Sequence, residues 1–312
     1  MKTRAARLVA HGKPLEVMQV ELPTPADDEV LVELSYAGVN PVDRYNLEGS
    51  VAPDGPVPRT LGGEASGHVD GVPVVIAGEG IGGSRDGVFA EAAVVPRAAI
   101  VEIPDGVSLR DAGAVSVLGL TALRVVEIAE VGPSDRVLVL GGSGGVGLSV
   151  ISYAASRGAE VWGQTGTESK AAAITAMGAT KAIVADASGL AAATREFSPT
   201  VVIDSLGGRF TSSALEALAI RGRIVIFGAS SGPETTIGLH ALYRRQHTIL
   251  TYGGATASRD ERRAALARVL DAMAAGSLRV AIGAEVSLDE VNDAFGLLTD
   301  RVVTGKVLLK LR

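Results

Sequence analysis

The first third of the chain is patterned as short β-strands. Apolar and polar residues alternate over Leu15 to Leu22 and over Val30 to Tyr36, which is the period of a strand with one buried face. Two further strands are predicted at Gly71 to Val75 and at Phe89 to Val95. No helical period appears before Leu109, so this part of the chain predicts a mostly β unit.

From Leu109 onward, apolar strand runs alternate with segments whose apolar residues have helical spacing. A helical segment over Leu109 to Val131, with a break near Gly119, comes first. The predicted strands that follow are Arg136 to Leu140, Glu160 to Gln164, Ala182 to Asp186, Val201 to Ser205, Arg223 to Gly228 and Thr248 to Tyr252. The helical segments between them are Leu148 to Arg157, Glu168 to Met177, Leu190 to Phe197, Phe210 to Ile220 and His240 to Gln246. This alternation predicts a parallel, doubly wound sheet.

The alternation ends near Gly254. Two helical segments, Arg259 to Ala275 and Leu288 to Thr299, and one strand, Lys306 to Lys310, make up the tail. Because the tail cannot simply extend the sheet, we expect it to return to the N-terminal β unit. The length of 312 residues is near twice the roughly 150 of one domain. We therefore predict a β-rich domain from residues 1–115 and 255–312, and an inserted sheet domain from residues 116–254.

Composition excludes several classes of function. The chain has no cysteine, which excludes disulfides, thiolate metal sites and a cysteine nucleophile. Asp and Glu number 35 against 29 Lys and Arg, whereas a nucleic-acid-binding protein usually carries a basic face. No apolar run approaches about 18 residues, and the N-terminus has no apolar h-region. We therefore expect no nucleic-acid partner, no membrane span and a cytoplasmic location.

The strongest chemical signal is the run Gly-Ser-Gly-Gly-Val-Gly at residues 142–147. It fits G-x-G-x-x-G, follows a predicted strand and precedes a predicted helix. Glycines let the backbone approach a pyrophosphate, and the free N–H groups at a helix N-terminus bind its charge. The run therefore predicts a dinucleotide site.

A second copy of the same spacing provides an internal control. Residues 78–83 read Gly-Glu-Gly-Ile-Gly-Gly, but a strand rather than a helix is predicted after them. Without a helix N-terminus the copy has no fixed set of free N–H groups. It is interpreted as a surface loop, one that could border a site.

The first run also overlaps a hydrolase motif. Residues 141–145 fit G-x-S-x-G, the nucleophile elbow of α/β-hydrolases, and Asp204 and then His240 or His247 follow in the required order. Both histidines lie near Arg244 and Arg245, where a solvated helix face is expected, and no HGGG-type oxyanion segment is present. A hydrolase is the weaker interpretation.

Cofactor preference is read at the end of the second strand of the sheet. NAD enzymes usually place a carboxylate there, on the ribose hydroxyls. Here the segment 161–167 reads Val-Trp-Gly-Gln-Thr-Gly-Thr, with Glu160 before it and Glu168 opening the next helix. Small residues leave room for a 2′-phosphate, and Lys170 can neutralise it. NADPH is therefore favoured over NADH.

Several linked segments resemble one family. Residues 37–45 (AGVNPVDRY) and 61–67 (LGGEASG) are similar to the zinc-free quinone oxidoreductases of the medium-chain dehydrogenase/reductase superfamily. The resemblance continues through residues 119–122, 163–170 and 304–307, and so covers nearly the whole chain in order. It implies an α/β fold with a GroES-like β-rich catalytic domain and a doubly wound Rossmann parallel sheet.

The resemblance also bears on metal. Zinc-dependent members of the superfamily have Cys at the position of Asn40 and a G-H-E motif at residues 62–64, which here read Gly-Gly-Glu. A catalytic zinc needs about three protein ligands, and two of them are replaced. The resemblance therefore implies that the chain needs no metal.

Site residues follow from the resemblance by position. It places Asn40 and Thr121 near the nicotinamide. The remaining positions that it implies for the cofactor are Gly142, Ser143, Gly144, Gly145 and Val146 for the pyrophosphate, Gly163, Thr165, Gly166, Thr167, Lys170 and Arg301 for the adenosine phosphate, and Leu206, Phe227, Gly228, Ala229, Tyr252 and Gly253 for the nicotinamide side.

The implied chemistry is hydride transfer from NADPH to a quinone. The cofactor carries this chemistry, and the protein stabilises the charge that develops on the acceptor oxygen. Asn40 and Tyr45 are the expected donors, and Asp43 is expected to orient the loop that holds them. Two alternatives stay open: a reductase of enone or enoyl C=C bonds, and an NADP-binding sensor or structural protein with little turnover. The apolar edge strand Thr248 to Tyr252 suggests a homodimer.

Overall fold

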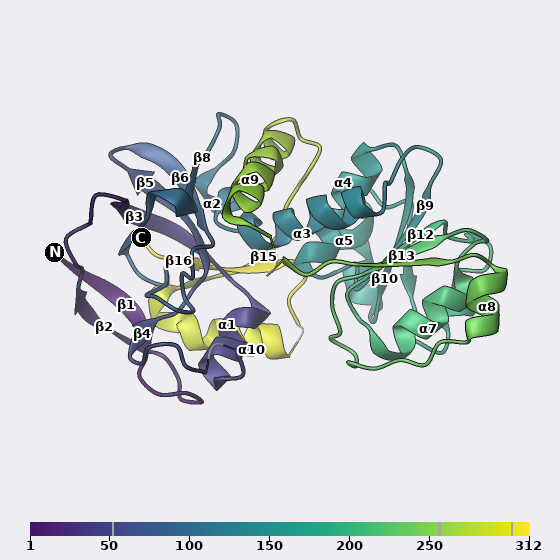
Figure 1. The fold of residues 1–312 in the computed structure, drawn as a ribbon, viewed down its shortest axis with the longest axis horizontal. Helices are drawn as coiled ribbons and strands as arrows, with labels where there is room; N and C mark the ends of the chain where they lie inside the picture. Colours follow the sequence, from purple (N-terminus) through teal and green to yellow (C-terminus); the bar gives the residue numbers. More distant parts are fainter. Residues whose placement is uncertain (52, 255–256, 301) are drawn as a thin grey trace. The chain divides into compact units, whose positions relative to one another are not determined.

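The structure is a computed structural model that describes residues 1–51, 53–254, 257–300 and 302–312. The chain divides into two units. The first comprises Met1–Leu120, Ala257–Ala275 and Val280–Arg312, and the second comprises Thr121–Thr256 and Gly276–Arg279. Both ends of the chain belong to the first unit (Figure 1).

Two β-sheets form the framework of the first unit. The larger has the strand order β15-β16-β3-β5-β6-β8, with β7 also pairing with β3, and the smaller has the order β2-β1-β4. The strands of the smaller sheet are β1 (Lys2–Leu8), β2 (Glu16–Glu21) and β4 (Arg59–Thr60), and those of the larger are β3 (Glu29–Val39), β5 (Glu64–Val69), β6 (Val72–Ala77), β7 (Ala92–Pro96), β8 (Ile100–Glu102), β15 (Ile282–Ser287) and β16 (Lys306–Lys310). Alternate residues of β3, among them Val32 and Leu34, enter one core with Phe89 and Phe295.

The tail of the chain completes the larger sheet. β16 runs antiparallel to β3, with Leu309 opposite Ala37, and β15 pairs in parallel with β16. Figure 1 shows β16 beside β3 although they come from opposite ends of the sequence. The expected return of the tail to the N-terminal unit is confirmed, as are the helices α9 (Arg259–Ala274) and α10 (Val291–Thr299).

A helix lies where the hydrophobic pattern predicts none. α1 (Pro41–Glu48) begins after the N-cap residue Asn40, has proline at its first position and ends at Gly49, whose φ of 78° is left-handed. Only Asp43 and Asn46 on it are buried, so no apolar stripe marks it. The prediction that no helix precedes Leu109 is therefore wrong.

The predicted break near Gly119 is also wrong. α3 (Val115–Ile128) runs straight through this glycine, and the interruption falls earlier, after the short α2 (Leu109–Ala112). A Cβ on Gly119 would lie 2.5 Å from Val115 Cγ2 and 2.7 Å from Val269 Cγ1. Glycine is present here because a neighbouring side chain packs against the helix backbone.

The second unit is a six-stranded parallel sheet. Its order is β11-β10-β9-β12-β13-β14, which is the 3-2-1-4-5-6 order of a Rossmann fold. The strands are β9 (Arg136–Leu140), β10 (Glu160–Thr165), β11 (Lys181–Val184), β12 (Val201–Asp204), β13 (Arg223–Ile226) and β14 (Thr248–Thr251), and the helices are α4 (Gly145–Ser156), α5 (Ala171–Ala176), α6 (Leu190–Ala193), α7 (Gly208–Ala217) and α8 (Leu239–Arg244). All six predicted strands are confirmed.

Right-handed crossovers place helices on both faces of this sheet, because the strand order reverses at β9. Figure 1 shows α4 and α7 on opposite sides of the strands. Trp162, on β10, stacks on Phe197 with ring centroids 4.3 Å apart, and both side chains belong to the hydrophobic core of this unit. No helix among the described residues is long and apolar enough to cross a membrane.

Candidate cofactor-binding and catalytic residues

The glycine-rich loop connects β9 to α4 in the second unit. Gly144 is the N-cap of α4 and offers no side-chain cap. A Cβ on Gly147 would lie 2.4 Å from the Gly141 carbonyl oxygen, and one on Gly142 would lie 3.1 Å from the Gln164 carbonyl oxygen. Gly147 is therefore required by the close packing of the helix on the loop, and Gly142 leaves little room for a side chain beside β10, as the fingerprint demands.

The start of α4 fits an anionic ligand. The first N–H groups of any helix lack intrahelical acceptors. Here the amides of Gly145, Val146 and Gly147 have no hydrogen-bond acceptor in the described part of the chain, whereas Leu148 N already binds the Gly144 oxygen. No side chain caps these three amides, and the helix dipole favours negative charge there. The residues present therefore fit a pyrophosphate.

Gln164 fixes this loop and was missed by the sequence analysis. Its side-chain oxygen accepts from Gly141 N at 3.0 Å, and its backbone oxygen accepts from Gly142 N at 2.7 Å. Its Nε2 donates to the Ala185 oxygen at 2.7 Å, so one buried amide links β9, β10 and the residue after β11. The signal that could have identified Gln164 was its polar side chain within a strand that was predicted to be apolar.

The hydrolase interpretation receives no support. Ser143 Oγ lies 3.1 Å from Thr165 Oγ1, its hydrogen-bond partner. Asp204 accepts from the amides of Leu206 and Gly207 and from Thr211 Oγ1, at 2.5–3.0 Å, and His240 packs against a tyrosine of α8. Within the described ranges no histidine therefore hydrogen-bonds to this serine.

The end of β10 carries no carboxylate. The strand ends at the buried Thr165, and Gly166 and Thr167 are exposed. The next residues form a single helical turn, Glu168–Lys170, before α5. A Cβ on Gly163 would lie 2.5 Å from Ile174 Cγ2, so this glycine also has a packing reason, because α5 approaches the strand there.

The other predicted cofactor residues of the second unit gather at one edge of the sheet. Strands β9, β12, β13 and β14 are parallel, so their carboxyl ends meet there, where α/β sheets bind ligands. Gly228 is required, because its Cβ would lie 2.6 Å from the Ser205 oxygen. The residues placed at these strand ends are Leu206, Phe227, Gly228, Ala229, Tyr252 and Gly253, while Thr121 lies on α3. Arg301 lies outside the described residues.

In the first unit, Asn40 belongs to a buried polar cluster that we define as Asn40, Asp43, Glu64 and Lys306. Asn40 Nδ2 donates to Glu64 Oε1 at 2.7 Å and to the Gly38 oxygen at 3.3 Å. Lys306 Nζ lies 2.5 Å from both Asn40 Oδ1 and Glu64 Oε1. The orientation of the Asn40 amide is therefore fixed from both ends.

Burial gives the cluster its electrostatic character. Glu64 and Lys306 are 0% and 5% exposed, so their charges neutralise one another away from water. The second Glu64 oxygen accepts from Val117 N at 2.8 Å. Gly38 makes room for the pair, because a Cβ there would lie 2.3 Å from Glu64 Oε1 and 2.8 Å from Lys306 Cε.

Asp43 is the titrating member of the cluster. Its Oδ2 accepts from Asn40 N at 2.8 Å, which holds the start of α1 to the residue before it. Burial raises the pKa of Asp43 to about 7, against the lowering effects of the Asn40 amide and of the Lys306 charge. Asp43 therefore changes its charge near neutral pH while touching Asn40.

Tyr45 lies apart from this buried cluster. Its side chain is 40% exposed on α1, and the Arg44 guanidinium lies 5.5 Å from its ring centroid. Asn40 is therefore buried and Tyr45 is exposed, although the two residues are only five apart in sequence. The structure brings Asn40 together with Glu64 and Lys306, which sequence reasoning had named only as parts of motifs.

Comparisons with known proteins now bear on both units. A family model described as the alcohol dehydrogenase GroES-like domain matches residues 26–105, and one described as zinc-binding dehydrogenase matches residues 145–275. The quinone oxidoreductase-like protein 2 of Bos taurus is 31% identical over 323 residues, covering 99% of this chain and 93% of the relative. The chain belongs to the medium-chain dehydrogenase/reductase superfamily and is quinone oxidoreductase-like.

Further relatives of this medium-chain oxidoreductase carry different names. An acryloyl-coenzyme A reductase of Metallosphaera sedula is 29% identical over 98% of this chain and 99% of the relative. The quinone oxidoreductase from Thermus thermophilus, solved also with NADPH, has a TM-score of 0.86 and 27% identity over 99% and 100% of the two chains. An NAD-dependent alcohol dehydrogenase has a TM-score of 0.90 and 30% identity over 99% and 100%. The α/β fold implied by the resemblance is confirmed.

Proposed function

We propose that this medium-chain oxidoreductase transfers a hydride from NADPH to a quinone without a metal. The observation that carries the proposal is a pair of features in the second unit. The start of α4 has no side-chain cap, and the end of β10 has no carboxylate. The first feature suits a pyrophosphate, and the second suits a 2′-phosphate better than a free ribose diol. NADPH supplies the hydride when it is bound.

The second unit provides the proposed binding groups. The amides of Gly145 and Val146 bind the pyrophosphate, and Gln164 holds the loop that presents them. Thr167 and Lys170 surround the adenosine phosphate, where the lysine charge is matched to a dianion. Support from relatives is indirect, since the solved structures include a quinone oxidoreductase complexed with NADPH and an alcohol dehydrogenase called NAD-dependent.

The first unit provides the proposed catalytic groups. Lys306 and Glu64 hold the Asn40 amide rigid, so that its orientation need not change when charge develops on the acceptor. Tyr45, whose side chain is exposed, is the proposed donor to the acceptor oxygen. Lys306 Nζ donates to Asn40 Oδ1. This contact supports the proposal that Asn40 binds an ammonium group rather than a metal ion.

Two other functions have a specific observation in their favour. Reduction of an enoyl C=C bond is supported by the relative named acryloyl-coenzyme A reductase. Cofactor binding with little turnover is supported by the Asn40 amide, because its Nδ2 already donates to Glu64 and to Gly38.

We further propose a homodimer joined along β14. This strand is at the edge of the sheet and pairs only with β13 among the described strands. Ile249 on it, and Leu239 and Tyr243 on the adjacent α8, are 36%, 71% and 60% exposed. An apolar edge of this kind is usually covered by a partner. Light scattering at micromolar concentration tests the proposal, and a monomer would contradict it.

A steady-state assay separates the three functions. NADPH consumption is followed with a panel of quinones, enones and acryloyl-coenzyme A, while cofactor binding is measured in parallel by calorimetry. Turnover with quinones above all other acceptors is expected. Turnover only with enones or the thioester supports the second function, and tight NADPH binding with no turnover for any acceptor supports the third.

A further inference from the structure

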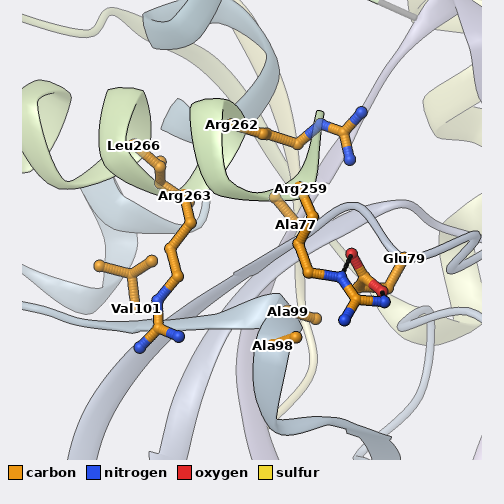
Figure 2. A pocket seen from close by; sticks show the side chains of 9 residues that line it. All are labelled: Ala77, Glu79, Ala98, Ala99, Val101, Arg259, Arg262, Arg263 and Leu266. Carbon is orange, nitrogen blue, oxygen red and sulfur yellow. Dashed lines mark hydrogen bonds and ion pairs between the residues drawn. The ribbon is translucent and has the colours of Figure 1, made fainter. Parts of the chain in front are cut away.

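A pocket of about 510 Å³ lies in the first unit, apart from every residue assigned above. Such a volume is typical of small-molecule sites. Arg259 and Arg263 line it from α9, four residues apart and so on one face of the helix. Figure 2 shows a smaller pocket beside this one, which shares Arg259 and Arg263 with it and is also lined by Arg262, whose side chain extends away from the other two.

The second glycine-rich run, residues 78–83, forms part of the pocket wall. No helix follows it, as predicted. Glu79 has a left-handed φ of 53°, and its carboxylate oxygens lie 2.9 Å from Arg259 Nε and 2.7 Å from Arg259 Nη2. Gly78 has a left-handed φ of 86°, which favours glycine, and the Arg262 guanidinium lies beside it. The loop therefore fixes the N-terminal turn of α9.

The pocket also holds charged groups without partners. Arg97 and Arg263 line it, and neither guanidinium has an ion pair or hydrogen bond to any described residue. Two further lining residues, Asp28 and Glu102, have carboxylates that likewise contact no described cation. Arg85, in contrast, pairs with Glu29 at 3.5 Å. All four residues are exposed, so two cations and two carboxylates without protein partners line one solvent-open pocket.

We propose that this pocket binds a small phosphate monoester that also carries hydroxyl groups, such as a sugar phosphate. Guanidinium groups bind phosphate oxygens in pairs of parallel hydrogen bonds, so Arg97 and Arg263 match a dianion. Carboxylates accept from hydroxyl groups, so Asp28 and Glu102 match the polyhydroxy part.

Calorimetric titration of the full chain tests the proposal with three probes: glucose 6-phosphate, inorganic phosphate and glucose. The titration is made with saturating NADPH, which fills the cofactor site, and is repeated without it. Glucose 6-phosphate is expected to bind equally in both, inorganic phosphate more weakly, and glucose not measurably. Arg97→Gln and Arg263→Gln should each weaken binding by about tenfold or more.

The controls isolate the pocket from general charge effects. Arg195 is exposed in the second unit, so Arg195→Gln makes the same charge change elsewhere and should bind as the parent does. No binding of either phosphate, or equal binding by Arg97→Gln, Arg263→Gln and the parent, would overturn the site. Equal affinity for inorganic phosphate and glucose 6-phosphate would overturn the roles of Asp28 and Glu102.

Discussion

Lys306, in the last strand of the chain, places its ammonium 2.5 Å from the Glu64 carboxylate, in the interior of the first unit. The same ammonium contacts Asn40, the position at which the resemblance implies a zinc-binding cysteine in metal-dependent members of the superfamily. Asn40 Oδ1 thus already accepts from a fixed cation of the protein, which is one basis of the proposal that no metal is bound here. The relationship makes a buried charge pair part of the candidate catalytic site.

Removing the Lys306 charge is expected to destabilise the protein strongly. Lys306→Met leaves the buried Glu64 carboxylate with its hydrogen bonds from Asn40 and Val117 but without its ion-pair partner, and breaking such a pair costs about 3–5 kcal/mol of unfolding free energy. Lys310→Met is the matched control, because Lys310 is exposed on the same strand and should change stability by less than about 0.5 kcal/mol. Urea unfolding measures both.

A double variant distinguishes a charge effect from a packing effect. If the uncompensated charge is the cause, Lys306→Met combined with Glu64→Gln should recover part of the loss. Additive losses in the double variant would contradict this explanation.

Stability should fall as pH rises from about 4 to about 7 because of Asp43. Its pKa is raised by burial from 3.8 to about 7, so the folded protein holds a proton that the unfolded chain releases. The stabilisation is complete below the unfolded pKa and is lost as pH rises through the folded one. Urea unfolding between about pH 4 and pH 7 should show a decline of at most about 4 kcal/mol from this group.

The Asp43→Asn variant is the control for this pH dependence. An amide does not titrate, so the decline between these pH values should become shallower than in the parent protein. An equal slope in the parent and the variant would assign the pH dependence to other groups.

Gly147→Ala should weaken both folding and cofactor binding. The new Cβ would lie 2.4 Å from a backbone oxygen, Gly141 O, which cannot move without displacing the loop. Overpacking of this kind costs about 1–3 kcal/mol. Gly132→Ala in the same unit is the control, since nothing lies within 4 Å of its Cβ. Thermal unfolding measures the loss of stability, and calorimetric titration with NADPH measures the loss of binding. An unchanged NADPH affinity in Gly147→Ala would contradict the role of this loop in cofactor binding.

Lys170→Glu should reverse the cofactor preference. A carboxylate repels a 2′-phosphate and accepts from ribose hydroxyls, so KM for NADPH should rise by about tenfold or more while KM for NADH falls. Arg195→Glu makes a similar change of charge on the same unit and should leave both values alone. Saturation of the parent by NADH at lower concentration than by NADPH would refute the 2′-phosphate argument.

Hydrophobic periodicity was sufficient for the second unit and insufficient for the first. The strands β9 to β14 are short apolar runs between helices, so pattern alone located them all. Strand β5, which begins at Glu64, contains Ser66 and His68, and its apolar period is therefore obscured. Helix α1 buries only polar residues, so its signals were Asn40 and Pro41 at its start and Gly49 at its end rather than a stripe.

The resemblance to a family supplied the candidate residues but not their contacts. Asn40 was expected as a donor to the substrate, and the structure shows both ends of its amide held by Glu64, Gly38 and Lys306. No spacing rule links residues 40, 64 and 306, since β3, β5 and β16 become neighbours only when the sheet forms. Gln164 was missed for the same reason, because its partners lie on loops that follow other strands.

The place of β16 in the larger sheet has a consequence for synthesis on the ribosome. Glu64 leaves the ribosome 242 residues before Lys306, so β3 and β5 are made long before β16, which pairs with β3 in the finished sheet. The second unit, by contrast, is nearly continuous in sequence and can fold as soon as it emerges. The first unit is thus completed only when β16 has been made, and a chain that stops short of β16 would leave part of the edge of β3 open and the Glu64 carboxylate without its lysine, a form that the quality-control machinery of the cell can recognise.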